Sequence, residues 1–381
     1  MKRLLLAGAG HAHAEVLKRL IATPIDNVEI VVVSPHALAP YSGMMPGWLA
    51  GTYRWEECCI AFAALAARAG ARFVATDITA LDADARSFTL ADGTSLVADV
   101  ASLNIGSTVV APDPRDDGPA VIAMRPLAEL ASRSRPVFDA WAKKTDETRR
   151  TTNLVAVGGG PAGVETILAA SARAASHDVA VKGSLAFAGD ALMPGLARGA
   201  ARRAEAALTR AGIAIHSGFN ARSFGIDEGM LTTSAAGEVI AEDGRKIAAD
   251  IVFWATGAVA HRWPRVSGLA VDAHGFVAVD ASLASRSHPW LFAAGDCAGF
   301  APPLPKSGVY SVRMGPMLAD NLRAELAGSA RRAFHAQRRH LVLLNRADGA
   351  AIGAWGPLSF EGRWAWRWKD RIDRRFVERY R

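Results

Sequence analysis

The sequence predicts an α/β protein with two domains, each built on a parallel sheet covered by helices. Three observations support this fold class. The chain has 381 residues, half of them hydrophobic, which is enough for two domain-sized cores. An apolar strand, a glycine-rich turn and a helix occur at residues 4–17 and again at residues 153–168. Two further apolar strands, each followed by a glycine, lie at residues 250–260 and 290–299.

The first stretch, LLLAGAGHAHAEVL, begins with a continuous apolar run that is typical of a buried parallel strand. Gly8 and Gly10 would let the turn close and bring backbone N–H groups to a pyrophosphate at the positive end of the helix. His13 replaces the third glycine of this pattern, which predicts a slightly splayed contact between helix and strand. The next strand, VEIVVVS, ends in Ser34, where an acidic residue usually binds the ribose.

The second stretch, NLVAVGGGPAGVETIL, aligns position for position with the first and carries all three glycines, Gly158, Gly160 and Gly163. A repeat of this kind indicates two dinucleotide sites. The following strand, SLAFAGD, ends near Asp190, two residues later than an ideal ribose-binding acid. NAD binding is therefore a weaker prediction than dinucleotide binding.

The fourth piece, WLFAAGDCAG at residues 290–299, contains the pair Gly295 and Asp296. Four such pieces in this order resemble the two-domain flavoproteins of the pyridine nucleotide-disulfide oxidoreductase superfamily. The resemblance implies two Rossmann-like domains, each with three layers in the arrangement ββα. The FAD-binding domain would be discontinuous (residues 1–115 and 265–330), with an NAD(P)H-binding domain inserted (116–264) and a basic C-terminal segment after it (331–381).

The same resemblance implies which residues bind each cofactor. Asp296 would bind the ribityl chain of FAD, and the backbone of Ile78 would contact adenine. The full set of expected FAD contacts is Gly8, Gly10, His11, Ala12, Ser34, Pro35, Ser42, Gly43, Met44, Ile78, Gly106, Ser107, Gly295, Asp296, Ser307, Gly308 and Val309. The expected NAD(P)H contacts are Gly158, Gly160, Pro161, Ala162, Gly163 and Gly257.

Three side chains are candidate catalytic residues because we expect them beside the flavin ring. Tyr41 lies in the stretch APYSGMMPG, whose proline and glycine residues favour a fixed loop that reaches the flavin ring. The alternative is a turn on the protein surface. Lys306, near a helix expected to begin at Gly308, could stabilise negative charge on the reduced flavin or remain solvated. Glu165 stands where NADH-using relatives contact the nicotinamide carboxamide, although it could equally complement the helix dipole.

The three cysteines argue against thiol chemistry. Cys58 and Cys59 are adjacent and Cys297 is alone, so the chain lacks a CxxC or CxxxxC pair and any zinc-ligand spacing. The disulfide-reductase branches are therefore disfavoured, and so is a polysulfide route, although PKSG at residues 305–308 also occurs in sulfide-oxidising flavoproteins. We predict no metal site, and we interpret His11 and His13 as loop and packing residues.

Longer stretches narrow the resemblance. GHAHAEVL, PYSGMMPGWLAGTY, LNIGS, PLPKSGVYSVRMGPMLADNL and WKDRIDRRF are similar to the NADH dehydrogenase-like flavoprotein found beside, or fused to, selenide, water dikinase. A histidine in place of the third glycine is usual in that group. The implied reaction is hydride transfer from NAD(P)H to FAD, then electron transfer to quinone or another small acceptor. Two alternatives stay open: a flavin-dependent step on reduced selenium or sulfur, and a flavin-binding accessory protein that docks on the kinase without turnover.

Positive charge is concentrated at the C-terminus. Residues 329–381 hold 13 Lys and Arg against five Asp and Glu, whereas the rest of the chain holds 31 against 32. This distribution favours one basic surface that meets anionic lipid or an acidic partner over general nucleic-acid binding.

The last 19 residues predict an amphipathic helix. RWAWRWKDRIDRRFVERYR places Trp364, Trp368, Ile372, Phe376 and Tyr380 at spacings of four. The helix would lie on a membrane that holds quinone, or dock on the chain's own flavin domain or on the partner in a homodimer. Its acidic residues favour docking because they interrupt the basic face (Glu361, Asp370, Asp373 and Glu378).

The expected compartment is a reducing cytoplasm, with at most peripheral contact with the inner face of the membrane. No window reaches 18 continuous apolar residues. The basic and apolar start, MKRLLLAGAGHAHA, is interpreted as the first strand rather than as a signal peptide.

Overall fold

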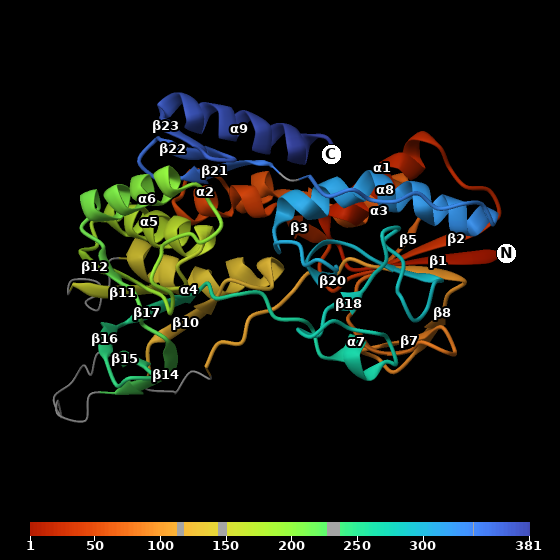
Figure 1. The fold of residues 1–381 in the computed structure, drawn as a ribbon, viewed down its shortest axis with the longest axis horizontal. Coiled ribbons are helices and arrows are strands. Elements are labelled where there is room, and N and C mark those ends of the chain that lie inside the picture. Colours follow the sequence, from red (N-terminus) through yellow and green to blue (C-terminus); the bar gives the residue numbers. More distant parts are fainter. Residues whose placement is uncertain (113–117, 144–150, 227–236, 338) are drawn as a thin grey trace.

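The computed structural model describes residues 1–112, 118–143, 151–226, 237–337 and 339–381. Two five-stranded sheets, each with helices packed against it, form the two halves of the molecule in Figure 1. The predicted domain boundary between residues 115 and 116 lies outside the described residues, and the predicted domain limits stay predictions.

The first sheet has the order β19-β9-β1-β2-β5, and all its strands are parallel. Its strands are β1 (Lys2–Ala7), β2 (Val28–Val33), β5 (Arg72–Val74), β9 (Val100–Leu103) and β19 (Leu291–Ala293). Strand β19 follows every strand of the second sheet in the sequence. The first unit is therefore discontinuous, which confirms the predicted fold class.

Both faces of the first sheet are buried, which explains the continuous apolar run of β1. Leu4 and Leu6 pack on the helix side, whereas Leu5 and Ala7 pack against Phe88 of a small antiparallel sheet. The helices of this layer are α1 (His11–Ala22), α3 (Phe62–Arg68) and α8 (Gly308–Ala327). The small sheet consists of β6 (Ile78–Asp82), β7 (Ser87–Leu90) and β8 (Ser95–Val97).

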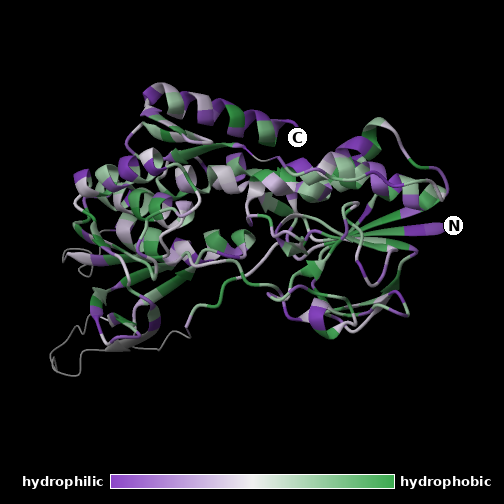
Figure 2. Ribbon diagram, in the orientation of Figure 1, coloured by the Kyte–Doolittle hydropathy of each residue, from purple (hydrophilic) through white to green (hydrophobic). Residues whose placement is uncertain are grey.

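The second sheet repeats this design in the order β10-β17-β11-β12-β13. The strands are β10 (Ala120–Ala123), β11 (Thr152–Val157), β12 (Val181–Ala186), β13 (Ala214–His216) and β17 (Ile251–Trp254). The helices are α4 (Leu130–Lys143), α5 (Pro161–Ser176) and α6 (Arg198–Arg210), and the antiparallel layer is β14 (Ala221–Ile226), β15 (Gly237–Ala241) and β16 (Lys246–Ala249). Figure 2 shows the strands of both parallel sheets mostly in the hydrophobic colour.

The C-terminal segment joins the two units. Strands β21 (Leu341–Asn345), β22 (Ala351–Trp355) and β23 (Leu358–Gly362) form an antiparallel sheet that contacts α5 and α6 of the second unit. Helix α9 (Arg363–Glu378) crosses this sheet and reaches the turn at Trp55–Cys58 of the first unit. In Figure 1 the segment lies in blue along the top of the molecule.

Short elements of the described chain include β3 (Leu38–Pro40), α2 (Met45–Leu49), β4 (Cys59–Ala61), α7 (Trp263–Val266), β18 (Val277–Ala278) and β20 (Ala298–Gly299). Among the helices of the described residues, none has both the length and the apolar character needed to cross a bilayer.

Candidate cofactor sites

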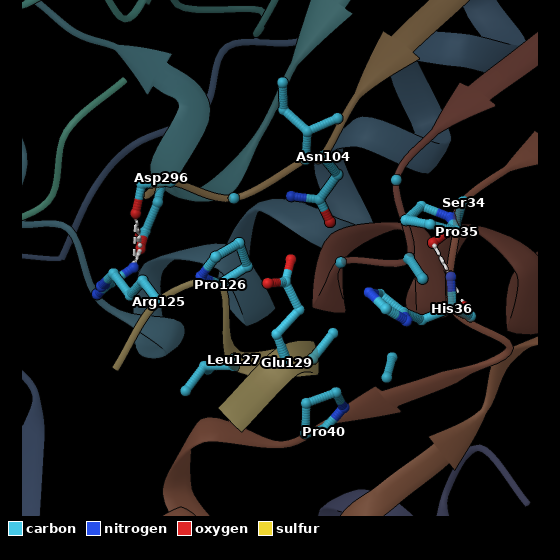
Figure 3. A pocket seen from close by; sticks show the side chains of 18 of the residues that line it. Ser34, Pro35, His36, Pro40, Asn104, Arg125, Pro126, Leu127, Glu129 and Asp296 are labelled. Carbon is cyan, nitrogen blue, oxygen red and sulfur yellow. Dashed lines mark hydrogen bonds and ion pairs between the residues drawn. The ribbon is translucent and has the colours of Figure 1, made fainter. Parts of the chain in front are cut away.

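A cavity of about 400 Å³ opens where the first glycine loop joins β1 to α1. Figure 3 shows that side chains from several separate segments converge on it. The predicted FAD contacts among its lining residues are Gly8, Gly10, His11, Ser34, Pro35, Ser42, Ile78, Gly106, Ser107, Asp296 and Gly308. The other predicted contacts do not line the cavity. Each lies within two residues, in sequence, of a residue that lines it (Ala12, Gly43, Met44, Gly295, Ser307 and Val309).

Asn104, which sequence reasoning did not single out, fixes the start of α1. Its Oδ1 accepts hydrogen bonds from the backbone N–H groups of Ala12 (3.0 Å) and His13 (3.3 Å), and its Nδ2 donates to the Ala294 carbonyl at 2.6 Å. A Cβ atom at Gly10 would lie 2.1 Å from Asn104 Oδ1, so only glycine fits there. The one available signal was a polar side chain directly after a buried strand.

His13 packs inside the first unit in the place of the third glycine. The residue is fully buried, with Nδ1 2.7 Å from the Gly8 carbonyl and Nε2 2.8 Å from the Ser102 hydroxyl. Because a carbonyl only accepts, Nδ1 carries the proton and Nε2 accepts from Ser102. Burial lowers the pKa of His13 to about 4, so the ring is neutral at physiological pH.

Asp296 lies at another side of the cavity in an ion pair with Arg125. Arg125 also donates to the hydroxyl of Ser107 at 2.6 Å, and that hydroxyl lies 3.3 Å from Asp296. Arg125 follows β10 in a loop without a sequence motif, so sequence reasoning missed it. A cation and a carboxylate thus meet where the polar chain of a dinucleotide would run.

The start of α8 presents an unsatisfied hydroxyl next to the cavity. Ser307 is the N-cap residue of α8, and its buried Oγ has no hydrogen-bond partner among the described residues. Lys306 does not line the cavity. Its Nζ donates to the Ala298 carbonyl at 2.6 Å and lies 3.6 Å from the centre of the Phe276 ring, and burial lowers its pKa.

The loop that carries Tyr41 contacts helix α9 as well as the cavity. The Tyr41 ring stacks on Phe376 with ring centres 4.2 Å apart, and burial together with the Asp373 carboxylate raises its pKa. Lys369 donates to the Gly43 carbonyl at 2.5 Å and to Asp373 at 2.6 Å. Helix α9 therefore supports the loop expected to meet the flavin ring.

The second glycine loop leaves the start of α5 open. Strand register makes Ala255 the counterpart of Asn104, and its methyl side chain cannot accept hydrogen bonds from the first turn of α5 as Asn104 does from that of α1. Ala162 and Gly257 are exposed at this edge of the sheet, and Gly160 and Pro161 are partly exposed. A Cβ atom at Gly163 would lie 1.8 Å from the Gly158 carbonyl oxygen, so glycine is required there.

Glu165 contacts the C-terminal segment. Its Oε1 accepts the Asn345 N–H at 2.6 Å, and burial raises its pKa to about 7 while the Lys369 charge acts in the opposite direction. The matched residue of the first unit, Glu15, accepts the Tyr380 hydroxyl at 3.0 Å. Equivalent glutamates of the two units thus bind the two ends of the C-terminal segment.

The three cysteines are buried thiols. Burial raises the pKa of Cys58 and of Cys59 to about 12 and that of Cys297 to about 11, so thiolate is scarce at neutral pH. Within the described ranges no three His, Cys, Asp or Glu side chains form a group that could hold a metal ion.

Comparison with known proteins places this geometry in a family. Residues 2–325 match the family model described as pyridine nucleotide-disulphide oxidoreductase. The sulfide:quinone oxidoreductase from the hyperthermophilic bacterium Aquifex aeolicus has a similar structure, with a TM-score of 0.79 at 13% identity over 100% of this chain and 92% of that chain. The water-forming NADH oxidase from Lactobacillus brevis bound to NADH gives a TM-score of 0.72 at 17% identity over 93% of this chain and 75% of that chain.

A ferredoxin reductase from Rhodopseudomonas palustris gives a TM-score of 0.72 at 18% identity, over 93% of this chain and 82% of that chain. At these identities the structures show the shared fold alone. The family match, which spans most of the chain, shows more. The chain belongs to the pyridine nucleotide-disulphide oxidoreductase family, a family of flavoprotein oxidoreductases that use FAD with NAD(P)H.

Proposed function

We propose that this protein is an FAD-dependent oxidoreductase that takes a hydride from NAD(P)H and passes electrons to quinone or another small acceptor without a protein thiol. The observation that carries the proposal is the cavity of about 400 Å³ bounded by the first glycine loop, the Asp296 and Arg125 pair and the start of α8. FAD, when bound, supplies a carrier that accepts two electrons and releases them to an acceptor.

The residues around the cavity fit an elongated dinucleotide with a charged centre. The amides of Gly10 and His11 stand at the positive end of α1, and Asn104 already occupies those of Ala12 and His13. Asp296 would accept hydrogen bonds from ribityl hydroxyls. Ser307, whose buried hydroxyl has no hydrogen-bond partner among the described residues, directly precedes Gly308, which lines the cavity where the flavin ring is expected.

Direct electron release from the flavin fits the state of the cysteines. Cys58 is 0% and Cys59 3% exposed, and the pKa of each is raised to about 12. A thiol relay needs a thiolate that can reach the flavin, and neither residue lines the cavity. The buried cysteines therefore disfavour the thiol-dependent branches and support an acceptor that diffuses to the site.

A membrane-dissolved quinone is supported by the exposed face of α9. Trp364 (55% exposed), Trp368 (42%) and Ile372 (38%) point to solvent, and the rings of Phe360, Trp364 and Trp368 stack on one another in a cluster. The exposed arginines of the same helix include Arg363, Arg367, Arg371 and Arg375. An aromatic face rimmed by arginine suits the surface of an anionic bilayer.

The sequence predicted that the acidic residues of α9 favour docking on the protein, and three of the four are paired at the docked side of the segment, so they do not interrupt the exposed face. Asp370 accepts the Tyr53 hydroxyl at 2.6 Å, and Asp373 pairs with buried Lys369. Glu361, just before the helix, binds Arg203 and Arg346. Of the four, Glu378 alone is exposed.

Flotation with vesicles of phosphatidylcholine, with and without phosphatidylglycerol, tests membrane contact. We expect the wild type to bind the anionic vesicles and the double variant Trp364→Ser, Trp368→Ser not to bind them. Val266→Ser is a matched control because Val266 is 79% exposed on α7, on the opposite side of the molecule from α9. Failure to bind, together with a concentration-dependent dimer that Trp364→Ser breaks, would assign the face to a homodimer instead.

The link to selenium rests on sequence resemblance. A flavin-dependent step on reduced selenium or sulfur, and docking on selenide, water dikinase through the basic C-terminal segment, are the alternatives it supports. A pulldown with the kinase tests docking. Reduction of the flavin by selenide but by neither NADH nor NADPH would favour the first alternative over the proposed function.

Anaerobic titration of the yellow protein tests the proposed function. Addition of NADH or NADPH should bleach the flavin band rapidly, and a short-chain quinone should restore it. A band that stays oxidised with both nucleotides would overturn the proposal.

A further inference from the structure

The residue after β12 holds the position where an acid usually binds the adenosine ribose. Gly158 N–H donates to the Ala186 carbonyl as Gly8 N–H donates to the Val33 carbonyl, both at 2.8 Å. Strand register therefore matches Phe187 with Ser34, the residue directly after the second strand. The strand ends earlier than the sequence predicted, and Asp190 lies three residues beyond Phe187.

Phe187 is built into the second glycine loop. A Cβ atom at Gly159 would lie 2.6 Å from Cγ of Phe187, whose side chain is almost completely buried. In the first unit, Ala9 matches Gly159 and the small Ser34 matches Phe187. The middle glycine of the GGG run thus makes room for the aromatic ring, and a hydrogen bond from Met193 N–H to the Gly159 carbonyl (2.7 Å) holds the following loop in place.

The surroundings of Phe187 contain cations that a phosphate could meet. A cavity of about 490 Å³ lies between this loop and the start of α6, lined by Phe187 together with Asp190, Arg198, Arg202 and Glu205. Arg198 and Arg202 are exposed, and neither has an ion-pair partner within the part of the chain that the structure describes. The two carboxylates line the same cavity and are exposed as well.

We propose that Phe187 makes the second site accept a 2′-phosphorylated pyridine nucleotide, NADPH, at least as readily as NADH. A carboxylate at this position would accept both ribose hydroxyls of NADH and repel a 2′-phosphate. A phenylalanine does neither, and Arg198 or Arg202 can pair with the phosphate. The inference rests on the proposed function, because it concerns the nucleotide that the same site binds.

Two measurements test this inference on the flavin-loaded full chain. Calorimetric titration with NADP⁺ and NAD⁺ gives the two dissociation constants without turnover, and anaerobic stopped flow gives the rates of flavin reduction by NADPH and NADH. For the wild type we expect NADP⁺ to bind as tightly as NAD⁺ or more tightly. Phe187→Asp should shift the ratio of the two constants toward NAD⁺ by about tenfold or more, the effect of one charged hydrogen bond.

Arg198→Ala combined with Arg202→Ala covers the case in which Phe187→Asp fails to fold, because both side chains are exposed. This double variant should weaken NADP⁺ binding about tenfold and change NAD⁺ binding much less, because NAD⁺ lacks the 2′-phosphate. A wild type that prefers NAD⁺ by tenfold, or a double variant that binds NADP⁺ as tightly as the wild type, would overturn the inference while leaving the proposed function intact. Absence of both binding and flavin reduction with either nucleotide would overturn both proposals.

Discussion

The two glycine loops have the same backbone register but different side chains at three matched positions. The first unit carries His13, Ser34 and Asn104 where the second carries Gly163, Phe187 and Ala255. In the first unit, Asn104 and His13 satisfy helix amides and the Gly8 carbonyl from within the protein. In the second unit Ala255 offers no such acceptor to the helix start, and the Phe187 ring covers Gly159. One topology therefore supports two different binding edges.

The third glycine position shows the difference most clearly. In the second unit, α5 approaches so closely that a Cβ atom at Gly163 would lie 1.8 Å from the Gly158 carbonyl oxygen. In the first unit, the ring of His13 fills the space between α1 and the sheet and hydrogen-bonds to the matching carbonyl, that of Gly8. A glycine gives close packing there, and a buried histidine gives hydrogen bonds.

Gly163→Ala should have the largest effect. The added Cβ meets a backbone atom, which cannot move aside. We therefore expect the free energy of unfolding of the second unit to fall by about 3 kcal/mol or more. Hydrogen exchange of the α5 amides measures this loss. Gly160→Ala is the control, because nothing lies within 4 Å of a Cβ there. Equal protection in the two variants would show that α5 is not held close to the sheet.

His13→Ala should lower the free energy of unfolding of the first unit by about 3 kcal/mol, because it leaves a cavity and removes two hydrogen bonds from a fully buried site. Thermal unfolding of the FAD-loaded protein measures the loss. His11→Ala serves as a comparison because His11 lines the cavity instead of the core. A His13→Ala protein as stable as the wild type would contradict the packing role of His13.

The same histidine should make the first unit sensitive to acid. Its pKa is about 4 in the folded protein against 6.5 ordinarily, so between these values the unfolded chain binds a proton that the folded chain does not. The free energy of unfolding should therefore fall as the pH drops from 6.5 to 4, by up to about 3 kcal/mol from this group. Urea titrations at several pH values in that range measure the free energy of unfolding, which should depend less on pH in His13→Gln than in the wild type. An equal pH dependence in both proteins would show that folding does not lower the pKa of His13.

Asn104→Ala should have a smaller effect on stability, about 2 kcal/mol, since it leaves two helix amides and the Ala294 carbonyl without their partner. We also expect weaker FAD retention, because Asn104 positions the helix start beside the cavity. Gel filtration followed by flavin absorbance measures retention. Normal FAD content in Asn104→Ala would separate this side chain from the cofactor site.

Sequence patterns predicted the elements around both loops because apolar runs and glycine spacing are local signals. Contacts between distant residues had no such signal. Arg125 reaches Asp296 across 171 positions, and Asn104 reaches Ala294 across 190. Neither pair belongs to a motif that the residue pattern alone would identify.

The C-terminal helix shows how a local pattern can mislead. Its bounds were well predicted, but the row from Trp364 to Tyr380 does not stay on one face. Each step of four residues turns the row by about 40°, so its start and end face different directions. Trp364 is 55% exposed, whereas Tyr380 is 2% exposed and hydrogen-bonds to Glu15.

Tyr380→Phe should have the smallest effect, about 1 kcal/mol, because it removes a single hydrogen bond to Glu15. Proteolysis of the C-terminal segment measures whether α9 detaches from the first unit. Tyr310→Phe is a control, since Tyr310 is also buried but lies in α8. Faster cleavage in the control than in Tyr380→Phe would contradict the anchoring role of Tyr380.

The division of roles between the two loops is tested most directly by counting bound cofactors in loop variants. FAD released from the denatured protein gives one count, and calorimetry with NADP⁺ gives the other. We expect one of each per chain, with Asn104→Ala lowering only the FAD count and Ala162→Glu, which adds a negative charge at the exposed start of α5, lowering only nucleotide binding. Loss of the same cofactor in both variants, or two FAD molecules per chain, would contradict the account.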